Sequence, residues 1–173
     1  MKLAFLYAGQ GSQHVGMGRD LYEQYPVFRD IFDGAPVDFD LKKLCFEGPE
    51  EQLSDTRYTQ PCMVAFAAGV TALLCQAGIQ PAMAAGLSLG EYSALQAAGV
   101  FDARTAIELV AFRGKVMAEA VTGRPCGMAA VLHLDREKLQ AACAAASDLG
   151  VAEIANYNCP GQLVIGGDAA AVE

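Results

Sequence analysis

The chain has 173 residues, of which 53% are hydrophobic and 18% charged, a composition typical of a globular protein with a substantial core. Its formal net charge of −8 argues against general nucleic-acid binding, which requires a basic surface. The longest apolar stretch, residues 62–75, is shorter than the roughly 18 residues that span a bilayer, so we expect a buried helix and no membrane segment. The six cysteines show no C-x-x-C pair and no metal-ligand spacing. They are therefore expected to be free, mostly buried thiols of a cytoplasmic protein, with no metal site.

The first part of the chain is expected to contain one strand, a glycine-rich loop and one helical segment. Residues 2–7 are strongly apolar, as in a strand covered on both faces in an α/β protein. The loop that follows has His14 where a dinucleotide motif needs glycine and Met17 where a P-loop needs lysine. Apolar residues then recur at helical spacing across residues 19–32, which predicts a helical segment with one inward face despite Pro26.

The next part is expected to contain a connection and a long helix. Residues 33–51 are polar, acidic and rich in turn residues, which predicts a surface connection with a short helix near residues 41–45. Thr59, Gln60 and Pro61 are expected to open the long buried helix, because proline is tolerated in a first helical turn. This helix is predicted to end near Gly78.

The sequence Gly86-Leu87-Ser88-Leu89-Gly90 fits the pattern G-x-S-x-G, a sharp turn from a strand to a helix. A short strand at residues 83–85 and a helix at 91–98 are expected on either side of it. The amide groups and dipole of that helix would favour negative charge beside Ser88, which suits a nucleophile next to a developing oxyanion. Taken alone, the motif is equally compatible with an ordinary strand-to-helix turn.

A further helix is expected at residues 104–120, and Arg113 lies in its mostly apolar sequence. Such an arginine either extends its guanidinium to solvent or pairs with an anion.

A candidate domain boundary lies at Gly123-Arg124-Pro125, which divides the chain into residues 1–124 and 125–173. Beyond it the expected order is strand, helix, strand, tight turn and strand, at residues 127–134, 135–147, 151–156, 160–161 and 162–166. This order begins a β-α-β-β-α-β unit, and Asp168 is expected to cap its second helix. Because little more than one turn of that helix precedes Glu173, we interpret the sequence as a fragment.

Five motifs occur in one order along the chain: Gly9-Gln10-Gly11-Ser12-Gln13 with Gly16-Met17-Gly18, Thr59-Gln60-Pro61, Gly86-Leu87-Ser88-Leu89-Gly90-Glu91-Tyr92, Arg113-Gly114 with Met117, and Ala155-Asn156-Tyr157-Asn158 before Pro160-Gly161-Gln162. Through them the chain resembles, over essentially its whole length, the N-terminal part of the malonyl-CoA:acyl carrier protein transacylases. The resemblance implies an α/β-hydrolase-like acyltransferase core in residues 1–124. It also implies an incomplete ferredoxin-like small domain in residues 125–173.

The resemblance further implies an enzyme of fatty-acid biosynthesis that acts through an acyl-serine. Ser88 would take the malonyl group from coenzyme A and pass it to the phosphopantetheine thiol of acyl carrier protein. The resemblance implies an oxyanion hole formed by the N–H groups of Gln10 and Leu89. Arg113 would bind the free carboxylate of the malonyl group through a charged hydrogen bond. Malonyl-CoA and acyl carrier protein are the expected partners, with no bound cofactor.

Secondary contacts to the pocket and to coenzyme A are expected from Gln60, Asn156 and Asn158. The chain departs from the family at Leu87, where members often carry histidine, and this change is expected to alter pocket polarity and leave the chemistry intact. The family's catalytic histidine would lie beyond Glu173. Removing such a base costs roughly 10⁴- to 10⁶-fold in turnover, so the segment alone is expected to be nearly inactive.

Two other functions remain open at this point. The first is a serine esterase or thioesterase of the α/β-hydrolase type with His133 as base, although such sites also need an acidic residue to orient the imidazole. The second is a non-catalytic module that binds the carrier protein, although a net charge of −8 repels an acidic partner at long range. His14 and His133 are otherwise expected to be structural.

Overall fold

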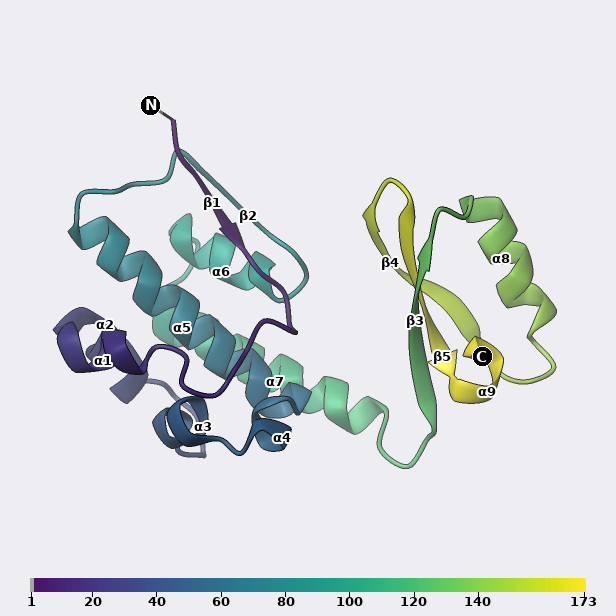
Figure 1. Ribbon diagram of the computed structural model, residues 1–173, viewed down its shortest axis with the longest axis horizontal. Helices are drawn as coiled ribbons and strands as arrows, with labels where there is room; N and C mark the ends of the chain where they lie inside the picture. The colour runs from purple at the N-terminus through teal and green to yellow at the C-terminus, as the bar shows by residue number, and fades with distance from the viewer. Residues whose placement is uncertain (1) are drawn as a thin grey trace. The chain divides into compact units, whose positions relative to one another are not determined.

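The structure of the protein is a computed structural model that describes residues 2–173 (Figure 1). Helices and strands are mixed along the chain, so the predicted α/β class is confirmed. The chain divides into two compact units, Met1–Ala120 and Val121–Glu173, each with its own sheet. We describe each unit by itself.

The first unit combines two parallel strands with a set of helices. Its elements are β1 (Ala4–Tyr7), α1 (Arg19–Gln24), α2 (Pro26–Asp33), α3 (Leu41–Glu47), α4 (Glu50–Leu53), α5 (Thr56–Gln76), β2 (Met83–Gly86), α6 (Gly90–Ala97) and α7 (Ala103–Ala120). β1 and β2 lie side by side, with Leu6 opposite Ala85 and Tyr7 opposite Gly86. This register places the end of β1 next to the G-x-S-x-G turn that follows β2.

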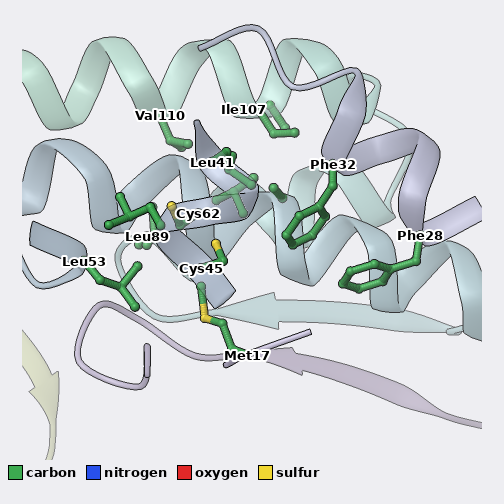
Figure 2. Close-up of a cluster of buried hydrophobic side chains, with 14 residues drawn as sticks. Met17, Phe28, Phe32, Leu41, Cys45, Leu53, Cys62, Leu89, Ile107 and Val110 are labelled. Atoms are coloured by element: carbon green, nitrogen blue, oxygen red, sulfur yellow. The ribbon is translucent and has the colours of Figure 1, made fainter. Parts of the chain in front are cut away.

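The core of the first unit lies between its helices (Figure 2). Phe28 and Phe32 of α2 stack on one another with ring centroids 4.7 Å apart. Gly69 of α5 lies against Phe28, since a Cβ there would come within 2.5 Å of the ring. The largest fully buried side chains also include Leu53, Leu89, Ile107 and Val110, from α4, the turn before α6, and α7. The core therefore joins α5 and α7 to the turn that carries Ser88.

The segment predicted as helical across residues 19–32 is divided into α1 and α2. The break lies at Tyr25, which has an extended backbone (φ −122°, ψ 113°). A residue that precedes proline is driven out of the α conformation by the proline ring, and Pro26 then begins α2. The predicted inward face is nonetheless present, because Phe28 and Phe32 of α2 are buried.

The start of the long helix α5 also differs from the prediction. Asp55 caps it, with its side chain accepting a hydrogen bond from the N–H of Arg57 at 2.9 Å, so the helix begins at Thr56. Pro61 therefore lies inside the helix and not in its first turn. Proline has no N–H to donate to the residue four positions earlier, so the carbonyl of Arg57 loses a helical partner.

The connection at residues 33–51 is less superficial than predicted. It contains α3, whose Leu41, Leu44 and Cys45 are buried in the core, and the start of α4. The periodicity of this short acidic segment gave too little signal to identify its buried face.

The prediction of mostly buried thiols is likewise wrong: Cys45 and Cys62 are buried, whereas Cys126 and Cys159 are exposed.

Helix α5 is long and apolar enough to cross a membrane by length and composition alone. Half of its most apolar window is buried inside the protein, and it packs against α2 and α7. Burial of this kind is typical of the core helix of a globular protein.

The second unit contains β3 (Cys126–Leu132), α8 (Arg136–Ala145), β4 (Ala152–Cys159), β5 (Gln162–Asp168) and α9 (Ala169–Val172). Its three strands form an antiparallel sheet in the order β3-β5-β4. Asp168 precedes α9 as predicted, but its carboxylate caps no helical N–H. It accepts instead from the N–H of Val151 and from Arg124, both at 2.9 Å.

Candidate active site

Ser88 lies at the tip of a sharp turn between β2 and α6. Its φ of 51° places it in the left-handed region, which few non-glycine residues occupy. The turn is closed by a hydrogen bond from the N–H of Gly90 to the carbonyl of Leu87 at 2.9 Å, and Ser88 itself is exposed. A serine held in a rare backbone conformation and open to solvent is the arrangement expected of a nucleophile.

The two glycines of the motif are required by the close approach of backbone segments. A Cβ at Gly86 would overlap the carbonyl group of Gly90, across the turn. A Cβ at Gly90 would overlap the carbonyl oxygen of Tyr7 at the end of β1. Any other residue at either position would force the strand and the helix apart.

Tyr7 anchors the end of β1 beside this turn. Its carbonyl accepts from the N–H of Leu87 at 3.2 Å, and its hydroxyl lies 2.8 Å from Oγ1 of Thr71 on α5. Because Thr71 donates its own proton to the carbonyl of Ala67, the tyrosine is the donor of this pair. Burial raises the pKa of Tyr7, so the phenol remains protonated and keeps this contact.

Arg113 of α7 reaches the serine. Its Nη2 donates to Oγ of Ser88 at 3.2 Å, and its Nη1 donates to Oε1 of Gln60 at 2.7 Å. The guanidinium carbon also lies 5.7 Å from the centroid of the Tyr92 ring, on α6. One cation thus joins α5, α6, α7 and the turn, and it lies where a negatively charged group attached to Ser88 would come.

Gln60 is fully buried, and its amide has a partner on both sides. Oε1 accepts from Arg113, while Nε2 donates weakly to Sδ of Met117 at 3.4 Å. The close approach of α5 and α7 depends on Gly114, because a Cβ there would lie 2.7 Å from the carbonyl oxygen of Thr56. Gly114, the residue next to Arg113, therefore allows Arg113 to reach Gln60.

Leu89 follows Ser88 in the turn, and Gln10 lies in the loop that touches this turn. Gln10 lies in the loop after β1, and its Oε1 accepts from Oγ1 of Thr56 at 2.7 Å. The loop touches the turn, since a Cβ at Gly9 would lie 3.0 Å from the carbonyl oxygen of Leu87. Within residues 2–173, the backbone N–H groups of Gln10 and Leu89 have no hydrogen-bond partner. Both are thus free to donate to a ligand.

Asn156, Asn158 and His133 lie in the second unit. Asn156 is in β4 opposite Val164, and Asn158 donates from its amide to Oε1 of Gln162 at 3.0 Å. His133 follows β3 with φ 56°, and its N–H donates to the carbonyl of Gly161. This contact fits a structural role for His133 in a tight turn.

His14 lies in the glycine-rich loop of the first unit, where its Nδ1 is 3.5 Å from the carbonyl oxygen of Ser12. In the described part of the chain, His14 is not hydrogen-bonded to Ser88. The same residues contain no cluster of histidine, cysteine, aspartate or glutamate side chains that could hold a metal ion.

Three contacts of the site were not predicted. Tyr92 belongs to the serine motif, yet its position under Arg113 depends on the packing of α6 against α7. Met117 follows Arg113 by four residues, so helical spacing could have placed both on one face of α7. Nothing in the sequence indicated the hydrogen bond of Thr56, because its partner Gln10 is 46 residues away.

The chain resembles known proteins in both sequence and structure. Residues 4–173 match the acyl transferase domain family. The chain is 43% identical to the malonyl CoA-acyl carrier protein transacylase of Bacillus subtilis (strain 168), over 99% of this chain and 55% of that protein. It therefore spans about half the length of the curated relatives that it matches.

Two solved structures resemble the protein closely. The first is MCAT from Streptococcus pneumoniae, 48% identical with a TM-score of 0.88, over 99% of this chain and 56% of that one. The second is a malonyl-transacylase in complex with a type II PKS acyl-carrier protein, 40% identical with a TM-score of 0.88, over 99% of this chain and 57% of that one.

Proposed function

Because the chain belongs to the acyl transferase domain family, we propose that it carries the nucleophile and the carboxylate-binding arginine of a malonyl transfer from coenzyme A to acyl carrier protein. The observation that carries this proposal is the 3.2 Å contact between Nη2 of Arg113 and Oγ of Ser88. A serine nucleophile explains an acyl intermediate, and a guanidinium beside it explains the choice of an acyl group with a free carboxylate.

The transfer consists of two exchanges at one carbonyl carbon. Oγ of Ser88 attacks the thioester of malonyl-CoA and loses its proton to a general base, and the coenzyme A thiolate leaves. The phosphopantetheine thiol of the carrier protein then attacks the serine ester, and Ser88 regains a proton as it departs. We expect the general base to lie in the part of the relatives that this chain does not cover. The chain alone should therefore be nearly inactive.

The oxyanion formed in each exchange would be bound by the N–H groups of Gln10 and Leu89. Their lack of an internal partner supports this role, because a donor already engaged would not be available to the developing charge. Leu89 immediately precedes α6, whose positive dipole end adds to the stabilisation. Loss of one such donor costs on the order of 10²- to 10³-fold in rate.

Arg113 would select the substrate by its charge. A malonyl carboxylate can pair with the guanidinium, whereas an acetyl group leaves that cation without its partner. A site built around a polar contact rejects a substrate that lacks it, because the unpaired group keeps its desolvation cost. We also propose that Gln60 holds Arg113 and that Asn156 and Asn158 contact coenzyme A.

We propose that acyl carrier protein is the acceptor of the malonyl group. This proposal is supported by a related malonyl-transacylase whose structure contains an acyl-carrier protein. The proposed reaction needs no bound cofactor and no metal, since the thioester itself supplies the activated acyl group. From the resemblance of its motifs to the malonyl-CoA:acyl carrier protein transacylases, we also propose that the protein is a cytoplasmic enzyme of fatty-acid synthesis.

We further propose that the first unit is part of an α/β-hydrolase-like core and that the second is part of a ferredoxin-like domain. The strand-to-helix turn at Ser88 supports the first assignment. In the second unit β5 lies between β3 and β4, which are joined through α8, and this is the arrangement of a split β-α-β unit.

The test is acylation of the purified chain, read by intact mass and peptide mapping after hours with malonyl-CoA or acetyl-CoA. We expect slow labelling of Ser88 by malonyl-CoA, little labelling by acetyl-CoA, and none in Ser88→Ala. Arg113→Ala should lose the preference for malonyl-CoA. Arg104→Ala is the matched control, because this second arginine of α7 contacts the carbonyl of Gly34 and should leave labelling unchanged. Equal labelling by both thioesters, or labelling of another residue, would overturn the proposal.

A further inference from the structure

The loop between β1 and α1 carries one of the two proposed oxyanion donors, the N–H of Gln10. Gln10 stands between Gly9 and Gly11, and Gly11 has a φ of 114°. Because glycine has more conformational freedom than any other residue, the backbone on both sides of Gln10 rotates easily. The N–H of Gly11 donates to Oε1 of Gln13 at 2.8 Å, but this bond stays within the loop. Contacts with the rest of the unit must therefore fix the direction of the Gln10 N–H.

The later part of this loop is tied to α3 and α4. The N–H of Gly16 donates to the carbonyl of Cys45 at 2.8 Å, and the N–H of Val15 donates to Oε2 of Glu50 at 3.2 Å. Both bonds act on residues that follow Gln10 by more than one turn of chain. They fix the end of the loop and leave Gln10 itself unrestrained.

Thr56, the first residue of α5, makes the contact at Gln10. Its hydroxyl donates to Oε1 of Gln10 at 2.7 Å, a good length for a hydrogen bond between two oxygens. The start of α5 is itself firmly held, because Oγ1 of Thr59 donates to the carbonyl of Leu53 at 2.6 Å and both residues are fully buried. Gln10 is thus tied to a rigid part of the unit.

The main chain of Thr56 also lies against α7. A Cβ at Gly114 would come within 2.7 Å of the carbonyl oxygen of Thr56, so α5 and α7 touch at the residue that follows Arg113. Thr56 therefore contacts the loop of Gln10 through its side chain and the helix of Arg113 through its backbone. The start of α5 supports both the proposed oxyanion donor and the proposed carboxylate-binding arginine.

We propose that Thr56 is a positioning residue for the acyl transfer, and that its hydroxyl holds Gln10 so that the Gln10 N–H stays in place for the oxyanion. This inference rests on the proposed function. A donor that is already in place when the charge develops stabilises the transition state without reorganisation. Loss of the hydroxyl should therefore slow acylation of Ser88. Recognition of the malonyl carboxylate, which is assigned to Arg113, should not change.

The first test measures the rate of Ser88 labelling at several concentrations of malonyl-CoA. Thr56→Val removes the hydroxyl and keeps the branched shape, whereas Thr56→Ser keeps the hydroxyl. We expect Thr56→Val to lower the maximal rate about tenfold, less than the 10²- to 10³-fold cost of losing an oxyanion donor outright. Its half-saturating concentration and its preference for malonyl-CoA over acetyl-CoA should equal those of the wild type. Thr56→Ser should label at the wild-type rate.

Thr105→Val is the matched control, because Thr105 lies near the start of α7 and hydrogen-bonds to Asp102 instead of to the loop. It should label at the wild-type rate. The inference is wrong if Thr56→Val labels as fast as the wild type, or if Thr56→Ser and Thr105→Val slow as much as Thr56→Val. A change in half-saturation or in malonyl preference would also overturn it, since Thr56 would then act on substrate binding.

The second test needs no substrate and reads the backbone order parameters of the loop by ¹⁵N relaxation. We expect a value for Gln10 of about 0.85 in the wild type and in Thr56→Ser, typical of rigid backbone, and below about 0.6 in Thr56→Val. Val15 should stay rigid in all three proteins. An unchanged Gln10 in Thr56→Val would overturn the inference. Absence of labelling in the wild type would instead overturn the proposed function, and the order parameters would still decide whether Thr56 holds Gln10.

Discussion

Nη1 of Arg113 donates to Oε1 of Gln60 at 2.7 Å, and this contact fixes which way the arginine points. Gln60 is fully buried in α5, so its amide cannot turn freely, and its other end contacts Met117. With Nη1 held, Nη2 is left directed at Ser88. We therefore propose that Gln60 acts on the site through the arginine, as a positioning residue.

Replacement of Gln60 by leucine should weaken the selection of malonyl-CoA over acetyl-CoA. Leucine preserves most of the volume in the core but offers no acceptor to Arg113. A hydrogen bond to a charged group is worth about 1.5–3 kcal/mol, so we expect the ratio of malonyl to acetyl labelling at Ser88 to fall roughly 10- to 100-fold. Intact mass measurements at matched times give this ratio.

The control for this prediction is Gln76→Leu, at the exposed end of the same helix. It should leave the ratio unchanged. If Gln60→Leu labels with the wild-type ratio while Arg113→Ala does not, Arg113 is oriented without help from Gln60.

Gly90→Ala should destabilise the first unit severely. The added Cβ would overlap the carbonyl oxygen of Tyr7, and both atoms belong to backbone segments held by sheet and helix. Overpacking of this kind costs about 1–3 kcal/mol or more, and here no flexible side chain can move aside. Urea unfolding followed by circular dichroism should show a clearly lower midpoint. Gly127→Ala is the control, because its Cβ would make only ordinary contacts of 3.5 Å or longer, so its midpoint should stay near the wild type.

Part of this site could be predicted from the local sequence. Two glycines around a serine indicated a strand-to-helix turn, and the structure confirms that turn, with Ser88 at φ 51°. The contact of Arg113 with Gln60 was not predictable, because it joins two helices through residues 53 positions apart. The start of α5 was misplaced for a different reason: Pro61 was given more weight than the stronger cap at Asp55. Packing decided the contact of Arg113, and no single stretch of sequence contains it, whereas the cap at Asp55 is a local signal.

The exposed cysteines should separate from the buried ones in reactivity. Cys126 and Cys159 are exposed, whereas Cys45 and Cys62 are fully buried next to one another in the core. A contact with Cys45 and burial raise the pKa of the Cys62 thiol, which disfavours the reactive thiolate. We expect a maleimide to modify Cys126 and Cys159 first in the native protein, with Cys45 and Cys62 reacting only after unfolding. Peptide mapping against time measures this order, and early modification of Cys62 would contradict the described core.

Asp168 should make the stability of the second unit sensitive to acid. The N–H of Val151 and then the guanidinium of Arg124 hold the pKa of this carboxyl below its usual value of 3.8. Because the folded pKa is lower than the unfolded one, the ionised carboxylate favours the folded state. Its contribution is fully present above the unfolded value and is lost as the pH falls below about 4 through the lowered folded value.

Asp168→Asn keeps an acceptor for Val151 but has no charge to lose, so its urea midpoint should fall less than that of the wild type between pH 6 and pH 3. Other carboxylates of the chain titrate in both proteins, and the difference between the two curves therefore isolates Asp168. Asp148→Asn, an exposed aspartate of the same unit, should follow the wild-type curve. Parallel curves for Asp168→Asn and the wild type would mean that the contacts with Val151 and Arg124 do not favour the ionised carboxylate in solution.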